Sequence, residues 1–376
     1  MHKKRVGIDL APVSYIAPGT ARHVSEQAKA LFKLDLPWDW LPTVESKENP
    51  LWTEIEHLSP LVLPGRKLWS RASFSIGRAW KNAGCQLGFC TAYFTPVYGI
   101  PVVTNYFDSN NFEFGKTWID SGRRWNFYLT NLLSHYSLYK SMRLFVNSQY
   151  CIDVISKNVP QVRKKLIKSP PGVTRPLACP TAIREWVSAY DKPFFLYVGM
   201  FSENKNQHRL IQAWKKLRAR SPECPNLVLV GGQDGSYFQE KIAPAISDLD
   251  SQEGIIIPGR VSEDHLIWLY HNAFSYIQPS IAEGLGIPIL EAMSYGLPVA
   301  CSCTTSLPET AGGAAIQFDP FSIKSIFNSL LTLSSSKKAR SELIEKGSRR
   351  WQDFTWEKNA EIVSQNIFTA LSQLSC

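Results

Sequence analysis

Short apolar runs alternate with helix-patterned stretches along the second half of the chain. Leu210, Ala213, Trp214 and Leu217 follow the i, i+3, i+4, i+7 spacing of a helix with one buried face. The apolar runs are short and uninterrupted, as in strands buried on both sides. Strict alternation of strand and helix predicts a parallel, doubly wound sheet. The predicted strands cover residues 194–199, 226–232, 254–259, 274–280, 297–302 and 314–319.

The first half repeats this plan less regularly, and we expect a second α/β domain there. The clearest predicted strands lie at 4–9, 100–105 and 143–148, and the predicted helices lie near 20–33, 66–82, 117–140 and 149–158.

Residues 35–64 show no clear period, because Trp38, Trp40, Trp52 and several prolines stand in irregular sequence. A packed insertion is the favoured interpretation. The alternative is a loop that stacks on a sugar or meets a membrane surface.

The chain has 376 residues, which is more than one hydrophobic core usually supports, so two domains are expected. The proline-rich segment 169–180 can continue neither a helix nor a strand, and it is a natural linker. We therefore predict a first domain over residues 1–176 and a second over 177–355.

Composition narrows the class of protein. No window approaches eighteen consecutive apolar residues, and the N-terminus passes from three basic residues directly into a predicted strand. A cytoplasmic location is expected. The eight cysteines are scattered, which predicts reduced, mostly buried thiols and neither a zinc site nor a disulfide framework.

Charge is divided unevenly along the chain. Residues 1–176 carry a formal charge of +11 and residues 177–376 carry −2. A basic first half suggests phosphates, an acidic lipid surface or nucleic acid as partner, while a merely solvated basic surface is the alternative. Because the chain has no recognised nucleic-acid-binding motif, we expect no nucleic acid.

The stretch PSIAEGLGIPILEAM, residues 279–293, carries the most informative chemistry. A strand ends at Ser280, and a helix begins near Pro288 and ends at Gly296. The loop between them lies at the carboxyl end of a parallel strand, which is where doubly wound sheets bind ligands. Glycines at 284 and 286 allow close approach to the backbone, and the helix N-terminus favours phosphate.

Two glutamates flank this loop, Glu283 before it and Glu291 one turn into the helix. A carboxylate facing phosphate would be repelled. Each glutamate is better explained as a hydrogen-bond acceptor for neutral hydroxyls on either side of a diphosphate. Sugar, diphosphate and ribose are the groups of a nucleotide sugar in that order.

The same stretch resembles the E-x7-E signature of retaining GT-B glycosyltransferases of family 4. Three further segments are similar to motifs of that family: YVGMFSENKNQHRLIQAW (197–214), GRVSEDHLIWLYHNA (259–273) and SLPETAGGAAIQFDP (306–320). Four ordered motifs are far more specific than E-x7-E alone. The last one resembles the branch with many mannosyl- and rhamnosyltransferases of O-antigen and exopolysaccharide synthesis, a group that includes lipopolysaccharide enzymes.

The resemblance extends into the first half. GIDL (7–10) and PGTARHVSEQAKAL (18–31) are similar to the glycine loop that faces donor phosphates and acceptor, which implies roles for Gly19 and Arg22. The segment 356–376 resembles the C-terminal helix that crosses back to the first domain. The implied fold is GT-B, with two doubly wound, Rossmann-like parallel-sheet domains facing across a cleft: an acceptor-side first domain and a nucleotide-sugar-binding second domain.

The resemblance also implies residue roles. Lys205 pairs with the diphosphate as the leaving group's charge develops. Glu283 holds donor-sugar hydroxyls, and Glu291 holds the ribose hydroxyls. The remaining donor contacts are Gly199 after the strand, Gly259 and Arg260 near the base, and Gly284, Leu285, Gly286 and Ile287 at the loop and helix start.

Two positions depart from the family pattern. Met200 stands where an arginine is often a second phosphate ligand, and VVTNYFDSN replaces a stretch that carries a histidine near the reacting sugar. Tyr106 occupies the nearest register to that histidine, with Asp108 displaced. Both are candidate catalytic residues.

The predicted activity is therefore retaining, metal-independent transfer of a hexose, with mannose and GDP-mannose favoured, to a saccharide or lipid-linked acceptor. No cofactor is expected beyond the nucleoside diphosphate sugar as co-substrate. The alternative is a catalytically degenerate sugar-nucleotide-binding subunit of a glycan assembly complex. The basic and aromatic stretch 65–81 suggests peripheral contact with the anionic inner face of the membrane, or equally a helix of the first domain's core.

Overall fold

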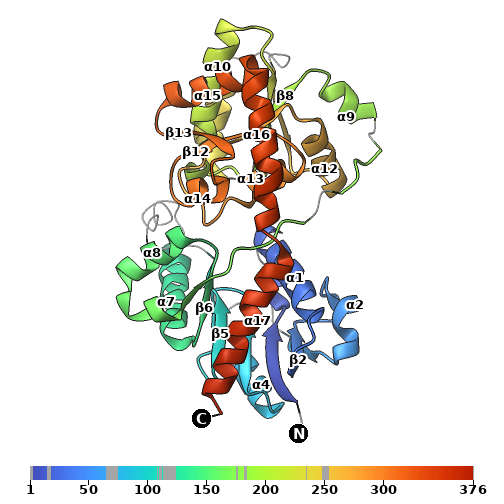
Figure 1. Ribbon diagram of the computed structural model, residues 1–376, viewed down its shortest axis with the longest axis vertical. Coiled ribbons are helices and arrows are strands. Elements are labelled where there is room, and N and C mark those ends of the chain that lie inside the picture. The colour runs from blue at the N-terminus through green and yellow to red at the C-terminus, as the bar shows by residue number, and fades with distance from the viewer. Residues whose placement is uncertain are drawn as a thin grey trace. The chain divides into compact units, whose positions relative to one another are not determined.

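The computed structural model describes residues 3–14, 18–64, 75–107, 109, 112, 124–174, 177–181, 184–233, 235–247 and 254–375. The chain divides into two compact units (Figure 1). Unit 1 comprises Met1–Gly172 and Phe354–Cys376, and unit 2 comprises Val173–Asp353.

Unit 1 is built on a seven-stranded parallel sheet in the order β3-β2-β1-β4-β5-β6-β7. The sheet is covered by helices, so its inner strands are buried along most of their length. The strands are β1 (Lys4–Asp9), β2 (Trp38–Val44), β3 (Leu61–Val62), β4 (Leu87–Cys90), β5 (Val102–Asn105), β6 (Leu144–Val146) and β7 (Leu166–Lys168).

The main helices of unit 1 include one from the far end of the chain. Helix α17 (Trp356–Gln373) lies beside α1 (Pro18–Phe32) in Figure 1 and buries its apolar face in the core around β1. Gln27 Nε2 donates to Asn359 Oδ1 at 2.8 Å, which joins the two helices by a buried polar contact. The other α-helices in the described residues of this unit are α2 (Trp52–Ile55), α4 (Ile76–Asn82), α7 (Arg124–Lys140) and α8 (Gln149–Asn158).

The expectation that residues 35–64 form a packed insertion is wrong in part, because the segment is packed but contains a strand of the sheet. Residues 38–44 form β2, which lies between β1 and β3 in the sheet, and Trp38 is 3% exposed. The pattern hid this strand because a proline usually excludes a strand interior. On the side of β2 that faces β3, only Thr43 and Val44 are paired. Pro42 is therefore tolerated, because β2 has no neighbouring strand at Pro42 on that side.

Unit 2 is built on a six-stranded parallel sheet in the order β10-β9-β8-β11-β12-β13. Chain order therefore reverses between β8 and β11, which is the topological switch point of a doubly wound sheet. The strands are β8 (Phe194–Val198), β9 (Asn226–Val230), β10 (Ile255–Gly259), β11 (Ser275–Gln278), β12 (Val299–Ser302) and β13 (Ala315–Phe318). All six were predicted from the apolar runs.

Helices cover both faces of this sheet (Figure 1). Helix α10 buries the apolar stripe that its spacing predicts, including Trp214 at 0% exposure. The α-helices are α9 (Arg184–Ala189), α10 (Gln207–Arg220), α11 (Ala243–Ile246), α12 (Glu263–Asn272), α13 (Ile287–Ser294), α14 (Leu307–Ala311), α15 (Ile323–Ser335) and α16 (Lys337–Arg350). Two parallel, doubly wound units confirm the predicted fold class.

Three expectations fall partly or wholly outside the described residues. The predicted helix 66–82 is described only from Ser75 onward, as α4, and the predicted helix 117–140 only from Arg124, as α7. Asp108 lies outside the described residues. Within the part of the chain that the structure describes, no helix is long and apolar enough to cross a membrane.

Candidate functional site

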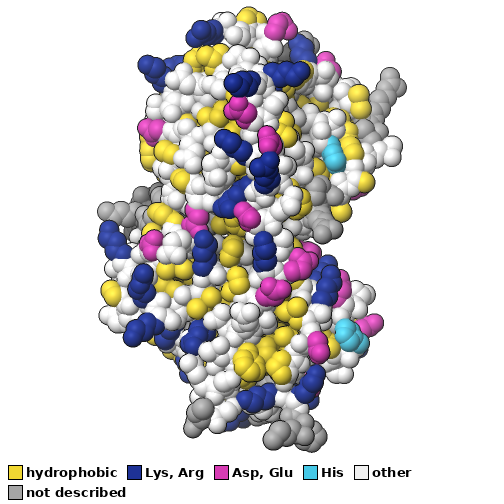
Figure 2. Space-filling view, in the orientation of Figure 1, with side chains coloured by type: hydrophobic (Ala, Val, Ile, Leu, Met, Phe, Trp, Pro, Cys, Tyr) yellow, Lys and Arg dark blue, Asp and Glu magenta, His cyan; other side chains and the backbone are white. Residues whose placement is uncertain are grey.

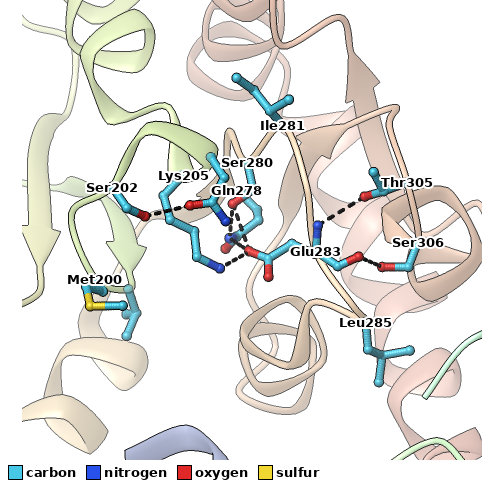
Figure 3. A network of polar contacts seen from close by, with 12 residues as sticks. Met200, Ser202, Lys205, Gln278, Ser280, Ile281, Glu283, Leu285, Thr305 and Ser306 are labelled. Carbon is cyan, nitrogen blue, oxygen red and sulfur yellow. Dashed lines mark hydrogen bonds and ion pairs between the residues drawn. The ribbon is translucent and has the colours of Figure 1, made fainter. Parts of the chain in front are cut away.

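The candidate site lies at the switch point of unit 2, where the loops after β8 and β11 meet. Lys205 ends the short 3-10 turn Glu203–Lys205 after β8, and Glu283 follows β11. Lys205 Nζ lies 2.6 Å from Glu283 Oε1, and the two side chains are 21% and 12% exposed (Figure 3). An ammonium and a carboxylate thus meet at the edge of the sheet where ligands bind.

Asn206 explains why the loop after β8 holds this position. Its backbone is left-handed, with φ of 61°, a conformation that asparagine tolerates better than most residues. Asn206 Nδ2 donates to the carbonyls of Pro279 at 3.0 Å and Pro320 at 2.8 Å. The amide of Ile281 donates to Asn204 O at 2.7 Å, so the two loops are fastened to each other.

The carboxylate of Glu283 is held by more than the lysine. Oε1 also accepts hydrogen bonds from Gln278 Nε2 and Ser280 Oγ, each at 2.8 Å (Figure 3). Behind them, Tyr276 donates its hydroxyl to Gln278 Oε1 at 2.5 Å. Burial raises the pKa of Tyr276 well above its usual value, so its hydroxyl keeps the proton that it donates.

The two oxygens of Glu283 therefore differ. Oε1 accepts three hydrogen bonds, whereas Oε2 has no partner among the described residues. A carboxylate fixed through one oxygen can offer the other to a ligand hydroxyl. This arrangement suits the predicted role of Glu283 as an acceptor for neutral hydroxyls.

The loop then turns into α13 through Gly286. This glycine has φ of 92° and precedes Ile287, the first residue of the helix. A Cβ on Gly286 would approach Leu307 Cδ2 to 2.4 Å, so a side chain here would be both strained and crowded. The positive end of the helix dipole faces the loop, which favours an anion there.

Glu291 lies on α13, and its carboxylate is oriented from α12. Tyr270 donates its hydroxyl to Glu291 Oε2 at 3.1 Å. The Tyr270 ring stacks on Tyr295, with ring centroids 5.2 Å apart and an interplanar angle of 4°. Glu291 is thus positioned by a tyrosine that is itself held by a second one.

The carboxyl ends of β8, β9 and β10 approach one another through glycines. A Cβ on Gly231 would lie 2.0 Å from Gly199 O, so the chain passes too closely there for a side chain. The amide of Gly231 donates to Gly259 O at 3.0 Å. Arg260 follows and is exposed, and a Cβ on Gly232 would lie 2.8 Å from its Nε.

Met200 follows Gly199 and is 61% exposed at the same edge of the sheet. Its carbonyl accepts a hydrogen bond from Gln207 Nε2 at 2.9 Å, so the backbone is fixed while the thioether side chain is largely in solvent. The structure thus places an apolar side chain where the sequence pattern led us to look for a second phosphate ligand.

The remaining predicted site residues belong to unit 1, whereas this cluster belongs to unit 2. Gly19 and Arg22 are exposed in the first turns of α1, which follows the carboxyl end of β1. Tyr106 is fully buried, and its hydroxyl lies 2.5 Å from Ser134 Oγ. Burial of that kind is typical of a packing residue. The catalytic and donor-binding roles of all these residues stay predictions.

Sequence reasoning missed the residues that hold the loop of Glu283. Gln278 and Ser280 bind its side chain, and Thr305 accepts a hydrogen bond from its backbone amide at 3.1 Å. One signal was present for Gln278, since a polar residue at the end of an apolar strand needs a partner once it is buried. Hydroxyl residues after β12 give no comparable signal.

Comparison with known proteins relates the part of the chain that carries this site to a family of enzymes. Residues 180–350 match the model of the family described as Glycosyl transferases group 1. O-antigen chain mannosyltransferase B of Escherichia coli is 31% identical over 183 residues. That match covers 48% of this chain and 47% of the relative, so it spans about half the length of that protein.

Solved structures show the same fold over nearly the whole chain. A glycosyltransferase from Rickettsia africae has a TM-score of 0.68 at 14% identity, covering 100% of this chain and 99% of that one. Anabaena Alr3699/HepE, in complex with UDP and glucose, has a TM-score of 0.65 at 15% identity, covering 99% and 100%. Residues 180–350 therefore resemble the group 1 glycosyltransferases, and the two parallel sheets of the chain are those of a GT-B fold.

Proposed function

We propose that this protein is a retaining glycosyltransferase that moves a hexose from a nucleoside diphosphate sugar to a saccharide or lipid-linked acceptor. The observation that carries the proposal is the Lys205–Glu283 pair at the switch point of unit 2. It supplies a cation for a diphosphate and an acceptor for sugar hydroxyls at one place. Mannose is favoured as the sugar, because the Escherichia coli relative is a mannosyltransferase in O-antigen synthesis.

In the proposed donor complex, the diphosphate lies between Lys205 and the start of α13. Phosphate oxygens are stronger ligands for the ammonium than a shared carboxylate, since they bring up to two negative charges. Lys205 turns from Glu283 to the phosphate, and Glu283 stays fixed by Gln278 and Ser280. Its oxygens then accept hydrogen bonds from donor-sugar hydroxyls, while Glu291 accepts those of the ribose.

The proposed chemistry proceeds on one face of the sugar. The bond from the anomeric carbon to the β-phosphate oxygen breaks as the acceptor oxygen bonds to the same face, which retains the configuration. The acceptor hydroxyl gives its proton to the departing phosphate. Negative charge that develops on the leaving group is stabilised by Lys205 and by the N-terminus of α13.

This scheme assigns the stabilising charge to protein groups, so we propose that turnover needs no divalent ion. Rapid loss of activity in EDTA, restored by added metal, would contradict that part of the proposal. The sugar-transfer step also needs no cofactor beyond the donor.

The acceptor side and the membrane belong to unit 1 in this proposal. Residues 1–176 carry +11, which would suit an anionic membrane surface presenting a lipid-linked acceptor. On the face shown in Figure 2, Lys and Arg side chains lie over both units with Asp and Glu side chains among them. Flotation of the protein with phosphatidylglycerol vesicles, compared with phosphatidylcholine vesicles, tests this contact and the proposed cytoplasmic, peripheral location.

The first experiment is a thermal-shift panel of UDP, GDP, ADP and their common sugar conjugates. Ligands that bind only the folded state raise its melting temperature. We expect one nucleotide family to stabilise the protein, with the shift lost in Lys205→Ala and in Glu291→Ala. The absence of a shift with every nucleotide would overturn the proposal.

A catalytically degenerate sugar-nucleotide-binding subunit is the second candidate. Exposed Met200 and fully buried Tyr106, at two positions where the family pattern places polar ligands, favour it. Donor binding without product, in assays with saccharide and lipid-linked acceptors, would distinguish this candidate from the enzyme.

A further inference from the structure

A row of hydroxyl groups that extends from the last residue of β12 to α14 binds the backbone of the loop that carries Glu283. Five side chains between residues 302 and 310 take part, and each binds a different backbone atom of the loop. Two of these atoms, the amide nitrogen and the carbonyl oxygen, belong to Glu283. Ser302 Oγ donates to Ser280 O, Thr304 Oγ1 to Ile281 O, Ser306 Oγ to Glu283 O and Thr310 Oγ1 to Leu285 O, while Thr305 Oγ1 accepts from Glu283 N.

Four of these contacts satisfy loop carbonyls, and only the Thr305 contact satisfies an amide. The carbonyls of residues 280, 281, 283 and 285 accept hydrogen bonds from side chains at the end of β12, in the loop that follows it and on α14. Carbonyl oxygens would repel a diphosphate if they faced it. Because these hydroxyl groups, here called the hydroxyl row, bind the four carbonyls, the carbonyl oxygens point toward the protein.

Thr305 differs from the other four because its backbone is strained. Its φ of 53° lies in the left-handed region, where a β-branched residue is a genuine outlier. Such conformations persist only when the surroundings enforce them, and they gather at functional sites. A glycine would occupy this backbone without strain, but it would have no oxygen for Glu283.

We infer that Thr305 is a positioning residue for Glu283, and that its side-chain oxygen explains why a threonine occupies this strained position. Figure 3 shows Thr305 beside the Glu283 amide, with Ser306 beside the Glu283 carbonyl. Backbone and side chain of Glu283 are thus fixed from opposite directions: by Thr305 and Ser306 on the backbone, and by Lys205, Gln278 and Ser280 on the carboxylate. The inference rests on the proposed function for its ligand.

A pair of variants tests the contribution of the Thr305 side-chain oxygen alone. Thr305→Ser and Thr305→Ala both leave an unbranched side chain on the same backbone, and they differ by one oxygen atom. Thr305→Gly removes the oxygen together with the strain. Ser329→Ala is the control, because it deletes another buried hydroxyl of unit 2 that donates within α15, to Ser325 O at 3.2 Å.

Amide hydrogen exchange of the full chain tests the positioning without any ligand. We expect Thr305→Ala and Thr305→Gly to speed exchange of the peptide containing Glu283 by about five-fold or more, since its amide loses an acceptor. Thr305→Ser and Ser329→Ala should leave that peptide within about two-fold of the wild type. Equal exchange in the Ala and Ser variants would overturn the inference.

A comparison of the affinities for GDP and GDP-mannose, and for UDP and UDP-glucose, tests whether Thr305 affects binding of the donor sugar. In Thr305→Ala and Thr305→Gly, affinity for the sugar conjugate should fall about ten-fold while affinity for the bare nucleotide is kept. A sugar conjugate bound as tightly by Thr305→Gly as by the wild type would show that the oxygen is dispensable. Should the wild type bind neither pair, the proposed function fails, and the exchange measurement still decides the role of Thr305.

Discussion

Lys205 Nζ and Glu283 Oε1 lie 2.6 Å apart although 78 residues separate them in the chain. The topology of the sheet accounts for this approach, because β8 and β11 are neighbours while the chain between them forms β9, β10 and their helices. Loops at the carboxyl ends of two such strands must meet. The pair is therefore a direct product of strand order, and it occupies the position where this class of sheet binds ligands.

The first prediction concerns the cation of this pair. Lys205→Met should lower kcat by about 10²- to 10³-fold, since it removes one preorganised charge at the leaving group. The fold should persist, because Gln278 and Ser280 still donate to the carboxylate. Steady-state kinetics measure kcat, and the melting temperature shows whether the fold persists.

Lys216→Met on the exposed face of α10 is the matched control, since it deletes an equal charge in the same unit. It should leave kcat within about two-fold of the wild type. A similar loss of activity in both variants would mean that Lys205 acts only through the net charge of the unit.

The second prediction concerns the exposed side chain at Met200. Met200→Arg places a guanidinium at the edge where the diphosphate is expected, and it should strengthen nucleoside diphosphate binding by about ten-fold. The side chain is 61% exposed, so the change should not affect folding. Isothermal titration with the nucleotide chosen by the thermal-shift panel measures the effect.

Met200→Gln is the control for this substitution, since it changes polarity and keeps a similar length without adding charge. Its affinity should match the wild type. Equal affinities for the Arg and Gln variants would show that the phosphates lie away from residue 200.

The third prediction concerns the support of Glu291. Tyr270→Phe keeps the ring that stacks on Tyr295 and deletes the hydroxyl that donates to Glu291 Oε2. Nucleotide affinity should fall by roughly three- to ten-fold, because hydrogen bonds to charged groups are stronger than neutral ones. The melting temperature without ligand should change little.

Tyr295→Phe is the matched control in the same stacked pair. Its hydroxyl accepts a hydrogen bond from the amide of Leu177 at 3.4 Å. If Tyr295→Phe weakens the nucleotide as much as Tyr270→Phe does, the effect comes from the aromatic stack.

The sequence predicted the fold class and the strands of unit 2, and the physical reason is the strength of each signal. Strands buried on both faces are continuous apolar runs, and Gly286, Pro288 and Gly296 mark the turn and the ends of α13 in order. The strand β2 was missed because tryptophans and Pro42 hide its period.

The side-chain geometry of the site could not be predicted from the sequence. The sequence named Lys205 and Glu283 separately, yet nothing in their spacing required an ion pair between them. The hydroxyl row at residues 302–310 depends on long-range register between β11 and β12. Local sequence pattern holds no information of that kind, and Thr305 could be recognised only from its backbone angle.

The fourth prediction concerns a buried histidine in unit 1. His23 on α1 is 5% exposed and packs against Phe107 and Trp356, with ring centroids at 4.5 and 5.3 Å. Burial lowers the pKa of His23 from 6.5 to about 3, because the charged imidazolium would lose its hydration. In the unfolded chain the imidazole regains its ordinary pKa.

At a pH between these two pKa values, the imidazole of His23 is protonated in the unfolded state and neutral in the folded state. Stability is therefore highest above pH 6.5 and falls as the pH is lowered toward 3. Between pH 7 and pH 5 this single group should lower the free energy of unfolding by about 2 kcal/mol. Urea denaturation at the two pH values measures the loss.

His23→Leu should reduce this pH-dependent loss by about the same amount, since the buried group no longer titrates in the unfolded chain. The exposed His57 provides the control, because His57→Gln also deletes an imidazole of unit 1. The difference between pH 7 and pH 5 should stay as in the wild type for His57→Gln and shrink for His23→Leu. A loss that is equally large in both variants would mean that other groups, in particular carboxylates, govern the acid sensitivity, and that His23 accepts its proton in the folded state.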